Sequence, residues 1–184
     1  MGSRLLVIMV FVVGMLAVGL GVPLAVANAA ATQREMFTQR LSDTNAFASS
    51  AERPLTDADT VALEESLRRY DELYGDPVLV LDRDGDLVVS SRTPVPVLDD
   101  EGAERVLLAR ARQYAAPYPL LMPWDDRPMV IAQPILDDTE LRGIVVMISS
   151  TAEVRADELR VWSLIAAAGL VALAVGVAVA VPVI

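Results

Sequence analysis

Two long segments without a charged side chain bracket this chain, and they constrain its fold more than any other feature. Leu5–Gln33 carries no charge over 29 residues, and Val161–Ile184 carries none over 24. A membrane-spanning helix needs about 20 apolar residues, and a soluble chain of 184 residues has no core large enough to enclose two such helices. The sequence therefore predicts two transmembrane helices with a water-soluble domain between them.

The segment between the two spans has the composition of an acidic globular domain. Arg34–Arg160 contains all 25 acidic residues and 14 of the 15 arginines, so its formal charge is −11. This charge argues against a nucleic-acid partner, which requires a basic surface. It permits a divalent cation or a cationic peptide, although acidic surfaces also serve solubility alone. The partner expected for this domain is an unknown small ligand or cation.

The first apolar segment is interpreted as an uncleaved signal anchor. Small-x-small sites at Ala25-Val26-Ala27 and Ala27-Asn28-Ala29 keep a cleaved signal peptide as the alternative. The apolar run before them has about 22 residues, whereas a signal-peptide core has about 7–15. Arg4 favours a cytoplasmic N-terminus, and the second span returns the C-terminus there. A composition rich in Arg, Ala and Val indicates a bacterium, so we expect a bacterial cell membrane with residues about 34–160 outside the cytoplasm.

Apolar residues at helical spacing predict that the first membrane helix continues into the domain and that another helix follows it. The first stripe faces either a dimer partner or the domain's own sheet, and it consists of Phe37, Leu41, Thr44 and Ala48. Arg53-Pro54 is predicted to end this helix. The second stripe ends at a Gly75 cap, and it consists of Leu63, Leu67, Tyr70 and Tyr74.

Five β-rich runs predict a sheet. Val78–Leu81 and Leu87–Ser91 flank a turn that contains Asp-Gly, which is a strong hairpin signal. The other three runs are Leu120–Met122, Met129–Leu136 and Gly143–Ser149. Val78–Leu81 is apolar on both faces, so this strand is expected to be covered on both sides.

Cap signals predict two more helices. Asp99-Asp100-Glu101 opens the first, and its inward face is predicted to be Val106, Leu107, Ala111 and Tyr114. Ser150-Thr151-Ala152-Glu153 is a capping box that starts the second. That helix is predicted to run through Trp162, an interfacial aromatic, directly into the second membrane span.

The predicted fold class is therefore α+β, with an antiparallel sheet of about five strands and flanking helices between two transmembrane helices. Residues 1–33 form the cytoplasmic N-terminus and the first transmembrane helix. Residues 34–150 form the extracytoplasmic domain. Residues 151–184 form a juxtamembrane helix and the second transmembrane helix.

With these elements in order, the chain resembles the N-terminal sensor region of bacterial two-component sensor histidine kinases. The hairpin Val78–Ser91 reads as apolar strand, Asp-x-x-Gly, apolar strand and Ser. Met129–Met147 reads as apolar strand, turn, Gly and apolar strand. Both patterns are similar to those of PAS-like sensor domains, also named PDC or single Cache domains. The resemblance implies a PAS-like fold for residues 34–150 and a homodimeric receptor.

The resemblance also implies a cytoplasmic kinase region that uses ATP and Mg and phosphorylates a cognate response regulator. This chain contains no histidine, so it lacks the phosphoacceptor of such a kinase. We therefore interpret it as the transmembrane input module, either truncated or the N-terminal part of a longer protein. Two alternatives stay open: the same input module on a chemoreceptor or diguanylate cyclase, and a membrane-anchored envelope protein without a signalling output.

No catalytic residue is expected within the chain itself, and no cofactor is evident. His, Cys and Lys are all absent, so the usual bases, thiol nucleophiles and Schiff-base formers are missing. The sequence also contains no Gly-x-Ser-x-Gly elbow and no phosphate-binding glycine loop.

Four residues are candidates for binding a small ligand, with arginine pairing a carboxylate and aromatic rings forming the walls. They are Arg92, Tyr118, Trp124 and Arg127. Core packing is the alternative role of the two aromatic residues.

Two further sets of candidates follow the turns and caps. Asp82, Asp84 and Asp86 offer oxygen ligands for Ca²⁺ or Mg²⁺, with a solvated hairpin turn as the alternative. The candidates for transmitting a signal from the last strand to the second span are Ser150, Glu153 and Trp162.

Overall fold

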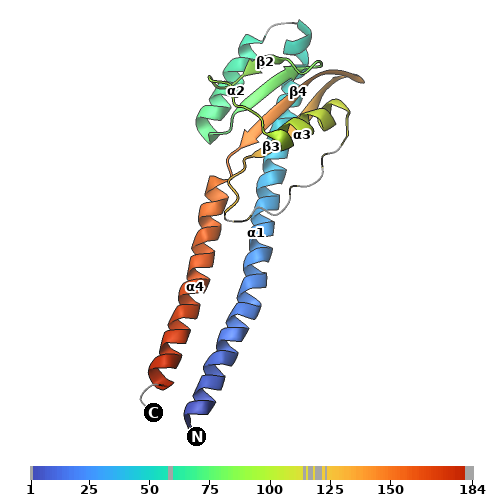
Figure 1. The fold of residues 1–184 in the computed structure, drawn as a ribbon. Helices are drawn as coiled ribbons and strands as arrows, with labels where there is room; N and C mark the ends of the chain where they lie inside the picture. Colours follow the sequence, from blue (N-terminus) through green and yellow to red (C-terminus); the bar gives the residue numbers. More distant parts are fainter. Residues whose placement is uncertain are drawn as a thin grey trace. The chain divides into compact units, whose positions relative to one another are not determined.

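The computed structural model describes residues 2–57, 60–113, 115, 118, 122 and 124–180. Figure 1 shows the order of its helices and strands. The chain divides into two compact units. The helical unit comprises Met1–Arg34, Leu120–Asp125 and Ala152–Ile184, and the sheet unit comprises Glu35–Pro119 and Asp126–Thr151. Each unit is described separately.

The sheet unit contains one antiparallel sheet of four strands in the order β2-β1-β4-β3. The strands are β1 (Val78–Asp82), β2 (Leu87–Ser90), β3 (Met129–Asp137) and β4 (Glu140–Ser149). Both predicted hairpins and the α+β class are confirmed. The prediction of about five strands is one too many for the described residues. Of the expected strand Leu120–Met122, only Met122 is described, and it belongs to no strand.

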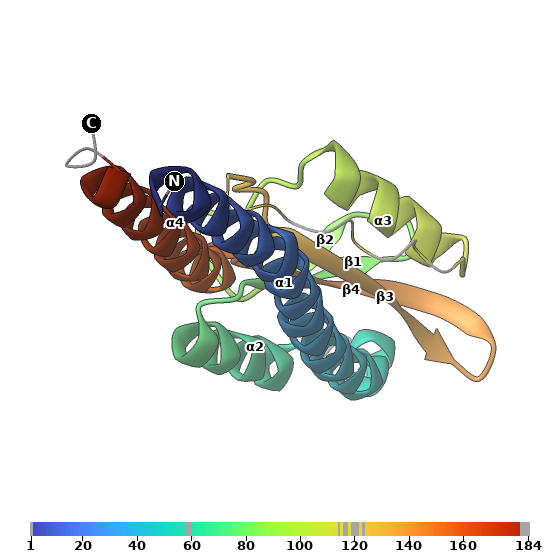
Figure 2. The ribbon, with the colours of Figure 1, turned by 90° about the horizontal axis from the view of Figure 1, so that it is seen from below.

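The central strands of this sheet are apolar on both faces, and helices bury each face. Figure 2 shows α2 (Val61–Tyr74) and the C-terminal part of α1 (Gly2–Asp57) on one face, with α3 (Asp100–Arg110) on the other. The α1/α2 core consists of Ala48, Ala51, Leu63, Leu67, Val78, Val80, Val89, Ile135, Val145 and Met147. The α3 core consists of Leu79, Leu81, Ala109, Val130, Ile144, Val146 and Ile148. Each large apolar side chain contributes about 1.5–3 kcal/mol on burial.

The apolar stripe that continues α1 faces the sheet. Thr44 is fully buried, and its hydroxyl lies 3.6 Å from the sulfur of Met147 in β4. Ala48 and Ala51 belong to the same core. Of the two alternatives that the sequence leaves open for this stripe, packing on the domain's own sheet is the one observed for Thr44 and Ala48.

Arg53-Pro54 does not end α1, contrary to the prediction, because the helix continues to Asp57. A proline removes one backbone hydrogen bond and crowds the preceding turn. Position 54 lies in the last turn of the helix, so the missing hydrogen bond interrupts only the final residues of α1. Ala51 is fully buried and Leu55 packs against the same core, so apolar contacts hold the segment in place.

The helix caps agree with the sequence more closely than the helix faces do. Gly75 ends α2 at φ +73°, and its N–H donates to the carbonyl of Asp71. The Asp99 side chain caps α3 by accepting from the N–H of Gly102 at 2.7 Å. The predicted inward face of α3 is wrong at Leu107, which is 62% exposed, and at Ala111, which is also exposed, whereas Arg105 is 8% exposed. Val106 packs against the core as predicted, and Tyr114 lies outside the described residues.

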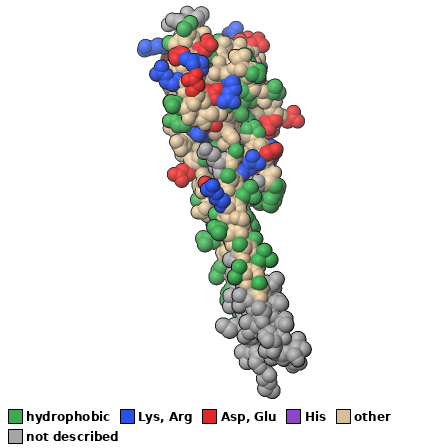
Figure 3. Space-filling model, turned by 90° about the vertical axis from the view of Figure 1, so that its left-hand side faces the viewer, with side chains coloured by type: hydrophobic (Ala, Val, Ile, Leu, Met, Phe, Trp, Pro, Cys, Tyr) green, Lys and Arg blue, Asp and Glu red, His purple; other side chains and the backbone are tan. Residues whose placement is uncertain are grey.

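The helical unit contains the N-terminal part of α1 and α4 (Ala152–Ala180). Among the described residues, one helix is long and apolar enough to cross a membrane, and it lies within Gly14–Arg53 near the N-terminus. This is weakly compatible with the predicted membrane localisation. On the face drawn in Figure 3, charged side chains are interspersed over the sheet unit, and hydrophobic side chains predominate in the described part of the helical unit.

Substitution of Gly143 tests how closely the sheet and α1 approach each other. A Cβ at this position would clash with the carbonyl oxygen of Leu81 in β1 and lie 3.0 Å from Cδ1 of Leu55. Gly143→Ala should therefore lower the free energy of unfolding by about 1–3 kcal/mol, measured by denaturant titration of the full chain in detergent. Gly19→Ala is the matched control because no atom lies within 4 Å of its added Cβ. Equal stabilities of the two variants would contradict this close packing.

Candidate functional site

A buried carboxylate joins three segments of the sheet unit. Asp76 lies between α2 and β1 and is 2% exposed. Its Oδ1 accepts a hydrogen bond from the Ser149 hydroxyl at 3.1 Å and from the Ser150 N–H at 3.2 Å. Its Oδ2 lies 2.9 Å from Nη2 of Arg40 on α1, in an ion pair rather than an aligned hydrogen bond. Asp76 therefore connects α1 to the end of β4, where the chain leaves for α4.

Arg40 is held from its other side by a tyrosine. Its Nη1 donates to the Tyr70 hydroxyl at 2.9 Å, and that hydroxyl donates to Asp43 Oδ2 at 2.7 Å. Tyr70 also packs edge-on against Phe47, with ring centroids 5.0 Å apart. We name Arg40, Asp43, Tyr70, Asp76 and Ser149 the Asp76 network. It joins α1, α2, β4 and the segment before β1.

Burial dominates the electrostatics of this network. Burial raises the pKa of Asp76 above its ordinary value, and the charge of Arg40 opposes part of that rise. Burial and the hydrogen bond to Asp43 raise the pKa of Tyr70, so its hydroxyl stays protonated and can donate. Removing one partner of a buried ion pair is costly because the other charge stays buried without compensation.

Arg92, a candidate ligand-binding residue, forms an ion pair with α2. Its Nη2 contacts Asp71 Oδ1, and its Nε donates to Asp71 Oδ2 at 3.0 Å. The Ser91 hydroxyl donates to the same Oδ2 at 2.9 Å. In the described structure Arg92 therefore connects the end of β2 to α2.

Tyr118 and Arg127 lie in a second cluster, around α3. The guanidinium carbon of Arg105 is 3.5 Å from the centre of the Tyr118 ring, a close cation–π contact. The Tyr118 hydroxyl donates to the carbonyl of Val130 at 2.6 Å. Glu101 pairs with Arg105 at 3.1 Å and with Arg127 at 3.4 Å. Burial raises the pKa of Tyr118 to about 12.

Trp124, the fourth candidate for ligand binding, is 79% exposed and belongs to the helical unit. The other three candidates belong to the sheet unit. Two of these, Tyr118 and Arg127, are linked through the residues around Arg105. The sequence did not single out Arg105, because a lone arginine on a solvated helix carries no distinguishing signal.

The three candidate metal ligands lie in the β1–β2 turn. Asp82 Oδ1 accepts hydrogen bonds from the N–H groups of Asp84 at 2.8 Å and Asp86 at 2.9 Å. Asp84 also lies 3.7 Å from Arg110. In the part of the chain that the structure describes, no three Asp, Glu, His or Cys side chains are grouped as metal ligands would be.

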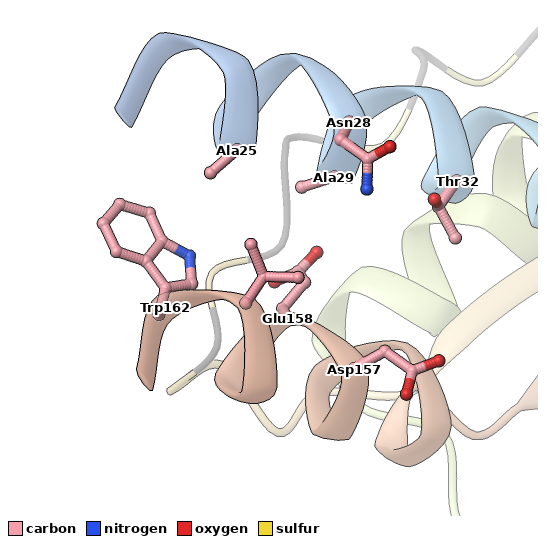
Figure 4. Close-up of a pocket in the computed structure, with 8 residues that line it drawn as sticks. Ala25, Asn28, Ala29, Thr32, Asp157, Glu158 and Trp162 are labelled. Atoms are coloured by element: carbon pink, nitrogen blue, oxygen red, sulfur yellow. The ribbon is translucent and has the colours of Figure 1, made fainter. Parts of the chain in front are cut away.

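The candidate transmission residues lie where β4 continues into α4. Ser150 donates its N–H to Asp76, and Thr151 donates its hydroxyl to the Arg127 carbonyl at 3.0 Å. The side chain of Glu153 lies outside the described residues. Trp162 lines a small pocket within the helical unit, opposite Ala25 of α1 (Figure 4).

The same pocket contains a buried glutamate, Glu158, that nothing in the sequence singles out. Glu158 is 8% exposed, its Oε1 has no hydrogen-bond partner, and its side chain extends toward α1 (Figure 4). Burial raises the pKa of Glu158. The residues of α1 that line this pocket carry no charge, and they are Ala25, Asn28, Ala29 and Thr32. Asp157 of α4 also lines the pocket.

Comparison with known proteins does not assign a family. No protein-family model matches the chain, and no curated protein matches it.

A double-mutant cycle measures the strength of the Asp76 network. Asp76→Ala should cost about 3–5 kcal/mol of unfolding free energy, because Arg40 and Ser149 lose a buried partner. Arg40→Met and Asp76→Ala should show a coupling energy of about 1–3 kcal/mol in denaturant unfolding of the full chain. The control pair is Arg142 and Asp137, 3.0 Å apart but partly exposed, with an expected coupling below about 1 kcal/mol. Similar couplings for the two pairs would contradict a special role for Asp76.

The buried glutamate predicts pH-dependent packing of α1 against α4. A carboxyl whose pKa is raised by packing stabilises the packed state at low pH, and this stabilisation is lost as pH rises through the raised value. The pH range in which this stabilisation is lost therefore lies above 4.5, the ordinary pKa of a glutamate. Spin labels at the exposed positions Ala31 and Leu159 should report a separation that grows as pH rises through this window.

Glu158→Gln is the control for that experiment, because glutamine has a similar shape and does not titrate. Its label separation should be constant over the same pH range. A wild-type separation that does not change with pH, or a variant that changes equally, would contradict the prediction.

Proposed function

We propose that the chain is the transmembrane signal-input module of a bacterial sensor histidine kinase. In this proposal the sheet unit is a PAS-like extracytoplasmic sensor domain between two membrane-spanning helices, and both termini are cytoplasmic. The module works as a homodimer. It passes a stimulus to a cytoplasmic region that uses ATP and Mg and phosphorylates a response regulator.

The observation that carries this proposal is the Asp76 network. Arg40 lies on the helix whose N-terminal part is apolar enough to span a membrane. Ser149 is the last residue of β4, and Ser150 lies two residues before α4 begins at Ala152. One buried carboxylate therefore contacts both segments through which the sheet unit is connected to the apolar helices. A change in this network can reach both helices, as transmembrane signalling requires.

The residues of the chain also support an input role rather than a catalytic one. The absence of His, Cys and Lys leaves Asp, Glu, Arg and Tyr as the titratable side chains. In the sheet unit, the buried members of this set form internal ion pairs, such as Asp71 with Arg92 and Asp76 with Arg40. A phosphoacceptor histidine must belong to a different segment or protein.

The membrane topology is tested with single cysteines, because the natural chain has none. Thr139→Cys in the exposed β3–β4 turn should react with a membrane-impermeant maleimide in intact spheroplasts. Ser3→Cys should react only after the membrane is permeabilised. Labelling of both positions in intact cells would contradict a cytoplasmic N-terminus, and labelling of neither would contradict an extracytoplasmic sheet unit.

Signal transmission is tested by joining residue 184 to the cytoplasmic region of a histidine kinase with a transcriptional reporter. Asp76→Asn should change the reporter output severalfold relative to the natural chain. Adding Leu159→Pro, which breaks α4, should abolish this difference while the sheet unit keeps its protease resistance. Leu159→Ala is the matched control and should preserve the difference, since Leu159 is 54% exposed. Persistence of the Asp76→Asn effect with the proline present would contradict transmission through α4.

A further inference from the structure

The segment before β3 contains the longest uncharged run between the two apolar ends of the chain. Residues 113–124 carry no charge over 12 residues, and they end in Leu120-Leu121-Met122-Pro123-Trp124. The next longest runs, residues 143–152 and 128–136, contain strands β4 and β3 of the sheet. The described residues of the run before β3 belong to no helix or strand, so sheet formation does not account for its apolar composition.

Trp124 ends this run on a tight turn and is turned outward. It is 79% exposed, and Met122 beside it is 37% exposed. The N–H of Asp125 donates to the carbonyl of Met122 at 2.8 Å, so Trp124 occupies the third position of a β-turn. A tryptophan ring gains a large free energy on leaving water. The turn therefore presents this ring outward instead of packing it.

The turn belongs to the same unit as the apolar helices. Leu120–Asp125 is part of the helical unit, although residues of the sheet unit precede and follow it in the chain. Both helices of that unit expose large apolar side chains, among them Leu20 and Leu24 of α1, at 71% and 72%, and Leu164 of α4, at 69%. One of these helices is apolar enough to cross a membrane. A bilayer that covers these side chains is therefore the surface nearest to hand for Trp124.

The turn is held close to the start of α4. The carbonyl of Arg127 accepts a hydrogen bond from the Thr151 hydroxyl at 3.0 Å, and α4 begins at the next residue, Ala152. Arg127 follows Trp124 by three residues, which span at most about 11 Å. From there α4 continues to its last charge, Arg160, and enters its uncharged part. Trp124 therefore lies near the end of α4 that the proposed topology places at the membrane surface.

The charges beside the turn favour a lipid surface without net charge. Two acids, Asp125 and Asp126, directly follow Trp124, and the next residue, Arg127, pairs with Glu101 at 3.4 Å. Anionic headgroups attract clusters of Lys and Arg, and the turn has no such cluster. Tryptophan is instead favoured at the headgroup level of any bilayer, because its ring is apolar and its N–H can donate a hydrogen bond.

We propose that the turn around Trp124 inserts into the lipid–water interface of the membrane that holds the chain's own helices, on the side of the sheet unit. The Trp124 ring and Met122 contact the first carbons of the acyl chains, and the indole N–H donates to lipid oxygens. The turn is then a contact with the bilayer in addition to α1 and α4. This inference rests on the proposed function for the membrane and its topology. It gives Trp124 a lipid partner in place of the wall of a ligand pocket.

Fluorescence of the full chain in phosphatidylcholine nanodiscs tests the proposal. Trp162→Phe leaves Trp124 as the only tryptophan. Its emission should shift to shorter wavelength than that of tryptophan in water. Lipid brominated close to the headgroup should quench it more strongly than lipid brominated near the chain ends, and acrylamide in the water should quench it weakly. Absence of quenching by both lipids would overturn the proposal, and short-wavelength emission without lipid quenching would assign the ring to a protein partner or a second copy instead.

A tryptophan elsewhere on the sheet unit is the control for this experiment. Val97 is 94% exposed and belongs to that unit, so Val97→Trp is introduced together with Trp124→Phe and Trp162→Phe. Acrylamide should quench this ring and brominated lipid should not. Equal lipid quenching at positions 97 and 124 would contradict a contact specific to the turn.

A spin label at Met122→Cys tests the same contact with both tryptophans in place, because the natural chain has no cysteine. Collisions of the label with oxygen, which concentrates in lipid, should exceed those with a water-soluble nickel complex. A label at Thr139→Cys, in the exposed β3–β4 turn, should show the reverse. Trp124→Ser should move the label at position 122 toward the aqueous pattern. Leu87→Ser, which removes a 45% exposed apolar side chain from β2, is the matched control and should leave it unchanged. A label that ignores Trp124→Ser would contradict the anchoring role of Trp124.

Failure of this proposal and failure of the proposed function give different results. Without lipid quenching of Trp124, the topology and reporter experiments can still succeed, and the chain then spans the membrane without an anchoring turn. With lipid quenching but no reporter output, the membrane contact stands and the signalling role fails.

Discussion

The buried carboxylate of Asp76 is the constraint on which the arrangement of the sheet unit depends. A carboxylate removed from water needs close compensation, or its burial costs several kcal/mol. Here Arg40 of α1 and Ser149 and Ser150 at the end of β4 provide it. If Arg40 moved away, the carboxylate would lose the cation that opposes it, and if the serines moved away, it would lose its hydrogen-bond donors. The positions of α1, of the segment before β1 and of the end of β4 are therefore set together rather than separately.

The parts of the fold that depend on local sequence could be predicted. The Asp-Gly turn between two apolar runs gave the β1–β2 hairpin, Asp99 gave the start of α3, and Gly75 gave the end of α2. Pro54 misled because a local rule ignores the apolar contacts of Ala51 and Leu55 that hold the last turn of α1. The inward face of α3 was wrong for a related reason, since the Tyr118 ring and Glu101 stabilise Arg105 in a buried position.

The sites were less predictable because they are assembled from residues far apart in the chain. Arg40 and Asp76 are 36 positions apart, and each alone looks like an ordinary surface charge. The only local sign is that Asp76 stands between Gly75 and Pro77, directly before a strand apolar on both faces. Glu158 is buried in a pocket that residues of both α1 and α4 line, among them Ala25 and Ala29, which lie more than 120 positions away in the sequence.

The burial of β4 has a consequence for how the sheet unit opens. From Gly143 to Ser149 every residue of this strand is buried, and it is paired on both sides. Backbone amides in such a strand exchange with solvent only when the whole unit unfolds, whereas those of an edge strand and a short helix exchange through smaller local openings. The strand that leads into α4 therefore belongs to the slowest-exchanging part of the unit. The edge strand β3 and the short helix α3 can open locally while β4 stays paired.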